Sequence, residues 1–370
     1  MKTYFPKLDS IRFYAFLLVF ISHIYIFCYH VSTTTSFWFL DKGPKIFAHG
    51  EIGVHIFFTL SGFLIMFLAI REFKTSSSFS ILNFFRRRIL RIWPVYFLAL
   101  SVGMLVAGGL TTDPTCIHRF WYFLGNTCMA TGVAQSDLVA LVGPLWSVSV
   151  EEQFYVAFPF LFALCIFLFK KWGKKVACIF GILAMLVLLI SLYQRYVHSE
   201  DWNYISYATV SVLPSLFLGM MLAVGVSIEK WKDRLGLWVR GNSRFLKLTA
   251  FGFFLLSLYI KFEQALGVSI YIVVLFVSTM SMILLSLYLP VEEKVTKLQS
   301  ASRYLGRISY GLYAYHMFAI VGIKHLFDSF DTNNGTLPVL YMQAILIFGV
   351  TILLAHLSYR YVEKLFLRLK

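Results

Sequence analysis

Arg12 and His23 lie eleven residues apart within the apolar stretch LDSIRFYAFLLVFISHIYIFCYH. Eleven residues make close to three helical turns, so on a helix both side chains point the same way, about 16 Å apart along the axis. A guanidinium binds phosphate through paired hydrogen bonds, and an imidazole can take a proton from a hydroxyl near neutral pH. The pair therefore predicts a site for one ligand with an anionic end and a reactive end.

Other ionisable residues are expected at the same two depths. Glu151, in PLWSVSVEEQFY, and His316, in LGRISYGLYAYHMF, come level with the imidazole if each helix rises about 1.5 Å per residue. Arg88 and Arg91 are three residues apart, share a helix face and come level with the first arginine. A long ligand with a polyphosphate head fits this arrangement, and acyl-coenzyme A is the commonest metabolite of that kind.

Each of these groups also has a purely structural interpretation. Arginines at the start of a span anchor it by reaching toward lipid headgroups. A lone histidine in a bundle commonly makes an interhelical hydrogen bond, and His316 fits that role as well as it fits a site. His55, in GVHIFFTLSGFLI, is either structural or lines an outward-facing cavity.

The composition identifies the surroundings of these residues. Of the 370 residues 59% are hydrophobic and only 14% are charged, whereas about a quarter of the residues of soluble domains are charged. This excludes an ordinary soluble domain and predicts an all-α, polytopic membrane helix bundle. The short apolar segment 118–134 is expected to be interfacial or re-entrant. About ten segments are long enough to cross roughly 30 Å of hydrocarbon, namely 10–31, 46–70, 89–110, 145–169, 176–194, 205–228, 246–262, 268–289, 304–326 and 338–361.

The basic residues predict an orientation. The net charge of +15 does not indicate nucleic-acid binding, because the basic residues form short clusters between apolar runs. The N-terminal segment, alternate loops and the C-terminal tail hold 26 of the 33 Lys and Arg residues, and the opposite loops hold six. Because cytoplasmic loops retain positive charge, both termini are expected in the cytoplasm. We expect the first span to stay as an uncleaved anchor and residues 1–370 to form one membrane domain without an appended soluble domain.

The five cysteines fit no metal-ligand spacing, so no metal is expected. Cys116 and Cys128 share one predicted outer loop, and the sequence leaves open whether they pair.

Five stretches, in their order along the chain, resemble the acyltransferase 3 family of integral membrane acyltransferases, which modify bacterial surface polysaccharides and related acceptors. They are LDSIRFYAFLLVFISH, GVHIFFTLSGFLI, RRRILRIWPVYF, PLWSVSVEEQFY and LGRISYGLYAYH, the last followed by SYRYVEKLFLRL near the C-terminus. The resemblance implies ten spans in a bacterial plasma membrane, acetyl-coenzyme A or another acyl-coenzyme A as cytoplasmic donor, and a hydroxyl of a lipid-linked or surface glycan as acceptor. The second stretch departs from the family's pattern, which commonly has an acidic residue where this chain has His55.

The resemblance also implies roles for individual residues. Arg12 and His23 correspond to the family's Arg-x10-His pair, Arg88 and Arg91 to its Arg-x-x-Arg motif, and Glu151 to the acid of its fourth span. We expect the arginines to bind the phosphates of the donor and His23 to act as general base on the acceptor, or as a transient acyl carrier. Glu151 is expected to orient or stabilise the imidazole. The candidates for contacts with the acceptor or for support of the site are Ser61, Trp146, Ser147, Tyr155, Tyr310, Tyr313 and His316.

Three alternatives remain open. A proton-coupled transporter could use the same histidines and glutamate as a relay. Another class of membrane acyltransferase uses an intramembrane His with a separate Asn, although few Asn residues fall within the spans of this chain. A non-catalytic relative would bind the donor or the glycan without reaction.

Overall fold

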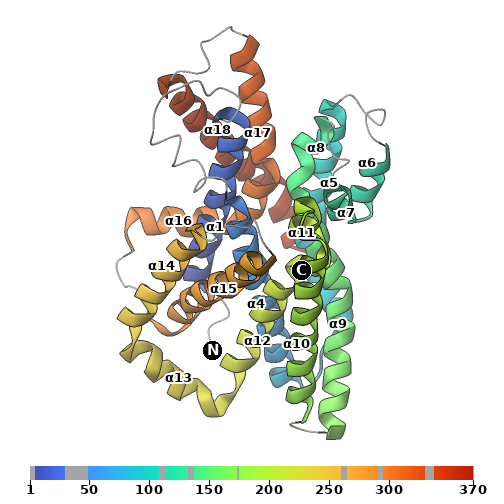
Figure 1. Ribbon diagram of the computed structural model, residues 1–370, viewed down its shortest axis with the longest axis vertical. Coiled ribbons are helices and arrows are strands. Elements are labelled where there is room, and N and C mark those ends of the chain that lie inside the picture. The colour runs from blue at the N-terminus through green and yellow to red at the C-terminus, as the bar shows by residue number, and fades with distance from the viewer. Residues whose placement is uncertain are drawn as a thin grey trace. The chain divides into compact units, whose positions relative to one another are not determined.

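A computed structural model describes residues 5–29, 49–107, 114–131, 137–172, 175–259, 265–290, 295–329 and 337–369. Every regular element in these ranges is a helix, as Figure 1 shows, so the predicted all-α class is confirmed for the described chain. The elements are α1 (Pro6–Ile24), η1 (Tyr25–Tyr29), α4 (Gly50–Ser76), α5 (Ile81–Val106), α6 (Pro114–Trp121), α7 (Gly125–Ala130), α8 (Asp137–Val142), η2 (Gly143–Leu145), α9 (Trp146–Trp172), α10 (Lys175–Val197), α11 (Trp202–Tyr207), α12 (Thr209–Ser227), α13 (Glu229–Gly241), α14 (Ser243–Tyr259), α15 (Ala265–Tyr288), α16 (Lys297–Arg307), α17 (Ser309–Ser329), α18 (Leu337–Ser358), η3 (Tyr359–Glu363) and α19 (Lys364–Leu367).

Seven helical segments of the described residues are long and apolar enough to cross a membrane, which makes the chain a multi-pass membrane protein. Three further predicted spans fall on α10, α14 and α17, so the count of ten stays a prediction. The seven segments are Pro6–Cys28, Gly50–Ser76, Ile81–Val106, Val139–Leu168, Asn203–Ser227, Ile270–Tyr288 and Pro338–Leu367.

One predicted span begins later than expected. Residues 304–307 belong to α16, and a new helix, α17, begins at Ser309. Thr296 and Gln299 form a capping box that starts α16, and the backbone N–H of Ile308 ends it by bonding back to the carbonyls of Gly306 and Tyr304. The apolar pattern did not reveal this break, because α16 is short and polar on one side.

The chain forms two compact units that interleave along the sequence. The first unit contains Met1–Leu8, His55–Phe85 and Ser149–Lys294, and the second contains Asp9–Val54, Arg86–Val148 and Val295–Lys370. Helices α1, α4, α5 and α9 each pass from one unit to the other. A single membrane domain over residues 1–370 remains a prediction, and the two units are described separately below.

Close helix contacts at small residues hold each unit together. In the first unit Gly62 of α4 and Gly219 of α12 face each other's helices, and a Cβ at either would collide with backbone atoms of Leu216 or Thr59. In the second unit Gly306 of α16 lies against the backbone of Asp9 in α1. Membrane helices use small residues in this way because apolar lipid supplies no hydrophobic force between them.

The segment 118–134, predicted to be interfacial, contains the second half of α6 and all of α7, and residues 132–134 lie outside the described residues. A disulfide joins Cys116 of α6 to Cys128 of α7, with the two Cα atoms 5.6 Å apart. The hydroxyl of Tyr96 in α5 donates to the carbonyl of Phe120 at 2.7 Å and fixes α6 to the neighbouring span.

Candidate active site

Two histidines meet in the second unit. His23 lies near the end of α1 and His316 in the first half of α17, and His316 Nε2 lies 2.9 Å from His23 Nδ1. His316 is fully buried, whereas His23 is half-buried. Aromatic rings enclose the pair: the ring of Phe16 meets that of His316 edge-on at 6.0 Å, and the ring of Tyr313 lies 5.6 Å away.

The hydrogen bonds of His316 fix where the protons lie. His316 Nδ1 is 2.7 Å from the carbonyl oxygen of Tyr313. A carbonyl can only accept, so Nδ1 carries the proton, and Nε2 of a neutral ring is then an acceptor. His23 Nδ1 must donate to it, which leaves the lone pair of His23 Nε2 without a proton. An ordered chain of two imidazoles and one carbonyl thus presents a basic nitrogen, as the carboxylate of a catalytic triad does for its histidine.

Tyrosines of α17 connect this pair to neighbouring elements of the second unit. Tyr313 donates its hydroxyl proton to the carbonyl of Pro144 at 3.0 Å and accepts from Ser147 Oγ at 2.9 Å. Trp146, next to this serine, is buried. Tyr310 donates to the carbonyl of Ile92 in α5 at 2.9 Å. These hydroxyls therefore hold α17, the helix that carries His316, against η2, the start of α9 and α5.

The predicted phosphate-binding arginines also lie in the second unit. Arg12 forms an ion pair with Asp9 at 3.5 Å, one turn earlier on α1. Arg88 and Arg91 of α5 are half-buried, whereas Arg86 and Arg87 are exposed. The spacing of three residues thus selects the two arginines that face inward from a run of four.

An acid that we had not predicted lies near these arginines. Glu363 is 6% exposed and ends the π-helical turn η3, close enough to Arg91 to interact with it electrostatically. Asp9 is likewise 6% exposed. Asp9 could have been found from its spacing of three residues before Arg12, since such pairs share a helix face.

Glu151 belongs to the first unit. Its Oε1 accepts from Ser61 Oγ at 2.6 Å and its Oε2 accepts from the hydroxyl of Tyr155 at 3.0 Å. Each carboxylate oxygen thus receives a hydroxyl proton, an arrangement that suits the ionised form. The group that the structure hydrogen-bonds to His23 is His316, which sequence reasoning had named only as a candidate for support.

His55 also has a partner within the first unit. Its Nδ1 lies 2.8 Å from Ser215 Oγ, and its ring is 5.9 Å from that of Tyr271. Arg195 of α10 is 1% exposed and donates to the carbonyl of Ser211. Ser211 and Ser215 are four residues apart on α12, so both buried groups meet one face of this helix.

Among the described residues, no cluster of three or more His, Cys, Asp or Glu side chains could hold a metal ion.

Comparison with known families decides the classification. A family model described as an acyltransferase domain, of the acyltransferase 3 type, matches residues 5–358. The chain belongs to the acyltransferase 3 family. The predicted family is thus confirmed, and Arg12, His23, Arg88, Arg91, Glu151 and His316 all lie within the matched range.

Three similar proteins are all named O-acetyltransferases. Peptidoglycan O-acetyltransferase OatA of Listeria monocytogenes strain EGD-e is 25% identical over 98% of this chain, which corresponds to 56% of its own length. A putative O-acetyltransferase of Staphylococcus aureus strain COL is 24% identical, and O-acetyltransferase OatA of strain NCTC 8325 is 23% identical, each over 97% of this chain and 57% of the relative. The chain thus spans less than two thirds of these relatives. No solved structure matches it significantly.

Proposed function

We propose that this protein is a membrane O-acetyltransferase that moves an acetyl group from cytoplasmic acetyl-coenzyme A to a hydroxyl of a cell-envelope glycan. The family assignment supports acyl transfer, and the names of the relatives favour O-acetylation, with peptidoglycan as the model acceptor. The observation that carries the proposal is the hydrogen-bonded chain from His23 through His316 to the Tyr313 carbonyl. It gives the protein a general base with a defined free nitrogen.

The reaction balances around this base. Nε2 of His23 takes the proton of the acceptor hydroxyl as its oxygen attacks the thioester carbonyl carbon. A carbon–oxygen bond forms, the carbon–sulfur bond breaks, and coenzyme A leaves as the thiolate. The thiolate then takes up the proton that His23 Nε2 received from the acceptor hydroxyl. The proton of His23 Nδ1 stays on the hydrogen bond to His316 throughout, so the imidazolium that forms is oriented and stabilised.

Arg12, Arg88 and Arg91 are proposed to bind the phosphates of the donor. The half-buried position of the last two favours this role over lipid anchoring alone, since exposed arginines would anchor equally well. Asp9 pairs with Arg12, and Glu363 interacts electrostatically with Arg91, so each acid reduces the cost of burying its guanidinium without ligand.

Glu151 is proposed as a carboxylate that takes part in the transfer reaction. Its two hydroxyl donors, Ser61 and Tyr155, fix its orientation. Glu151→Gln keeps the shape of the side chain and removes its charge, and we expect it to lower kcat. Unchanged turnover would exclude the carboxylate from the reaction.

The orientation of the chain is also a proposal. Both termini are assigned to the cytoplasmic side of a bacterial plasma membrane, because the terminal segments and loops on that side hold 26 of the 33 basic residues. The Cys116–Cys128 disulfide supports this assignment, since it lies in the predicted outer segment and disulfides persist in oxidising compartments.

A proton-coupled transporter is the second candidate, because two hydrogen-bonded imidazoles can also pass a proton from ring to ring. Release of free coenzyme A separates the two functions. Purified protein in liposomes, given acetyl-coenzyme A and a peptidoglycan fragment, should release coenzyme A in proportion to the ester formed. A protein that moves protons without consuming thioester would be a transporter.

A further inference from the structure

A cavity of about 270 Å³ opens in the first unit where two membrane spans end. The span Gly50–Ser76 contributes the last turns of α4, and the span Asn203–Ser227 contributes the end of α12. The first turn of α13 completes the wall. Because both spans stop here, the cavity lies at the level where a bilayer changes from acyl chains to headgroups.

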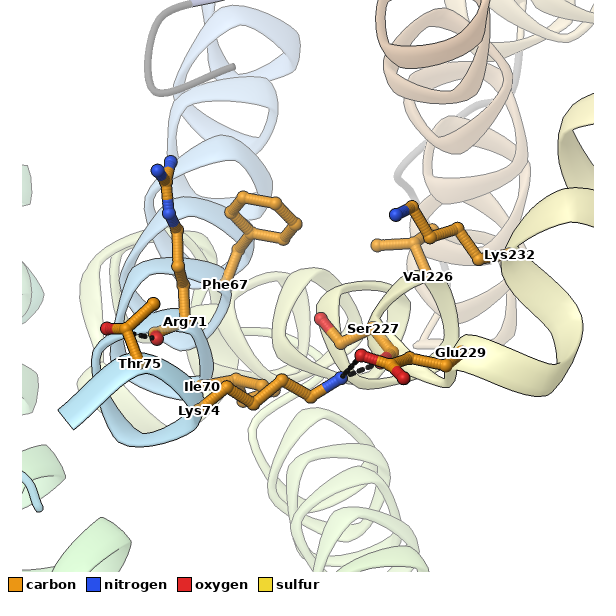
Figure 2. Close-up of a pocket in the computed structure, with 9 residues that line it drawn as sticks. All are labelled: Phe67, Ile70, Arg71, Lys74, Thr75, Val226, Ser227, Glu229 and Lys232. Carbon is orange, nitrogen blue, oxygen red and sulfur yellow. Dashed lines mark hydrogen bonds and ion pairs between the residues drawn. The ribbon is translucent and has the colours of Figure 1, made fainter. Parts of the chain in front are cut away.

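The lining combines an apolar wall with basic groups, as Figure 2 shows. Phe67 and Val226 stand between Arg71 of α4 and Lys232 of α13, and the ammonium of Lys232 points across the cavity toward α4. Both basic side chains are half-buried. They face one space from two different helices, which suits an anion that has an apolar continuation.

An ion pair closes one edge of the cavity. Lys74 Nζ donates to the carbonyl of Ser227 at 2.7 Å and to Glu229 Oε1 at 3.2 Å, and thereby joins the last turn of α4 to the junction of α12 and α13. This lysine and glutamate cancel each other's charge. The net charge of the lining is therefore positive and comes from Arg71 and Lys232.

Helix α13 has the character of a helix that lies in a membrane surface. In Figure 1 it runs across between α12 and α14. Its inner face carries Gly236, which contacts the ring of Tyr288 at the end of a third span. Its outer face exposes Trp231 by 60% and Trp238 by 47%, seven residues apart, together with basic residues. Exposed tryptophan next to Lys and Arg is typical of residues at the lipid interface.

We propose that this cavity binds the headgroup of one anionic phospholipid, with its phosphate between Arg71 and Lys232 and its glycerol against Phe67 and Val226. Basic pockets between membrane helices recognise such headgroups. The volume favours a headgroup over a whole nucleotide, because pockets for drug-sized ligands begin at roughly 300 Å³. This lipid site is independent of the transfer reaction proposed above.

Lipid retention tests the site. The wild-type protein, the double variant Arg71→Gln/Lys232→Gln and the matched control Lys230→Gln/Arg234→Gln are reconstituted in nanodiscs of equal parts phosphatidylglycerol and phosphatidylcholine. The control removes two positive charges from the exposed face of the same helix. Lipid that stays bound after extraction into detergent is counted by native mass spectrometry.

We expect the wild type and the control to keep one bound phosphatidylglycerol. The cavity variant should bind it about thirtyfold more weakly, since each cation raises the affinity for an anionic headgroup about fivefold. The charge-preserving variant Arg71→Lys/Lys232→Arg should keep the lipid, which separates loss of binding from loss of folding. Equal retention by the cavity variant, equal loss in the control, or retention of phosphatidylcholine instead would overturn the proposal. Displacement of the lipid by coenzyme A or by inorganic phosphate would overturn it too, by showing a site for a soluble anion.

Discussion

Replacing His316 with leucine removes the acceptor that keeps the proton of His23 on Nδ1. The Nδ1–H of His23 then meets a leucine side chain instead of its hydrogen-bond acceptor, which costs about 1–3 kcal/mol. If the cost falls on the reactive tautomer, kcat drops about 5- to 150-fold. The KM for acetyl-coenzyme A should stay unchanged, because the donor's phosphates are assigned to the arginines.

Two further variants sharpen this test. His316→Gln places an amide oxygen that can accept from His23, so it should retain more activity than the leucine variant. His325→Leu changes an exposed histidine of the same helix and should behave as the wild type. Steady-state transfer from labelled acetyl-coenzyme A to a glycan fragment gives kcat and KM for all three. Wild-type kcat in His316→Leu, or a change in KM alone, would refute the tautomer argument.

Two predictions concern stability. Gly306→Ala should lower the free energy of unfolding by about 1–3 kcal/mol, because the added Cβ would meet the backbone of Asp9. Gly322 has open space around it, so Gly322→Ala should leave the free energy of unfolding unchanged. Equal melting temperatures of the two purified variants would contradict this prediction. Replacing Cys116 and Cys128 with serine frees a loop of sequence separation 12 and should cost about 3 kcal/mol. Thermal unfolding with and without reductant measures it, and a wild type that reductant does not destabilise would show that the bond contributes little.

The sequence predicted the helical class well, because apolar length alone determines where a chain can cross a bilayer. It failed at the 304–326 segment, where the polar helix α16 and the more apolar helix α17 follow each other with a single residue between them. Hydropathy averages over such a junction. The spacing of Thr296 and Gln299 is that of a capping box and predicts that a separate helix begins there.

The candidate site was predictable in its residues and less so in its contacts. Counting turns put His23 and His316 at one depth, but depth does not say which helices are neighbours. The charge count considered only Lys and Arg. It therefore missed Asp9 and Glu363, which lie beside the predicted arginines. A buried arginine in a membrane protein is usually paired with an acid or a phosphate. The acids within a few residues of each span end were therefore candidate partners for the arginines.

Acetyl transfer by purified His23→Gln protein in liposomes tests the central claim most directly. The variant should insert and unfold as the wild type does while transfer from acetyl-coenzyme A falls about 100- to 10,000-fold, the usual contribution of a general base. If it released coenzyme A and formed glycan ester at the wild-type rate, the base would have to be another group and the proposed mechanism would be wrong.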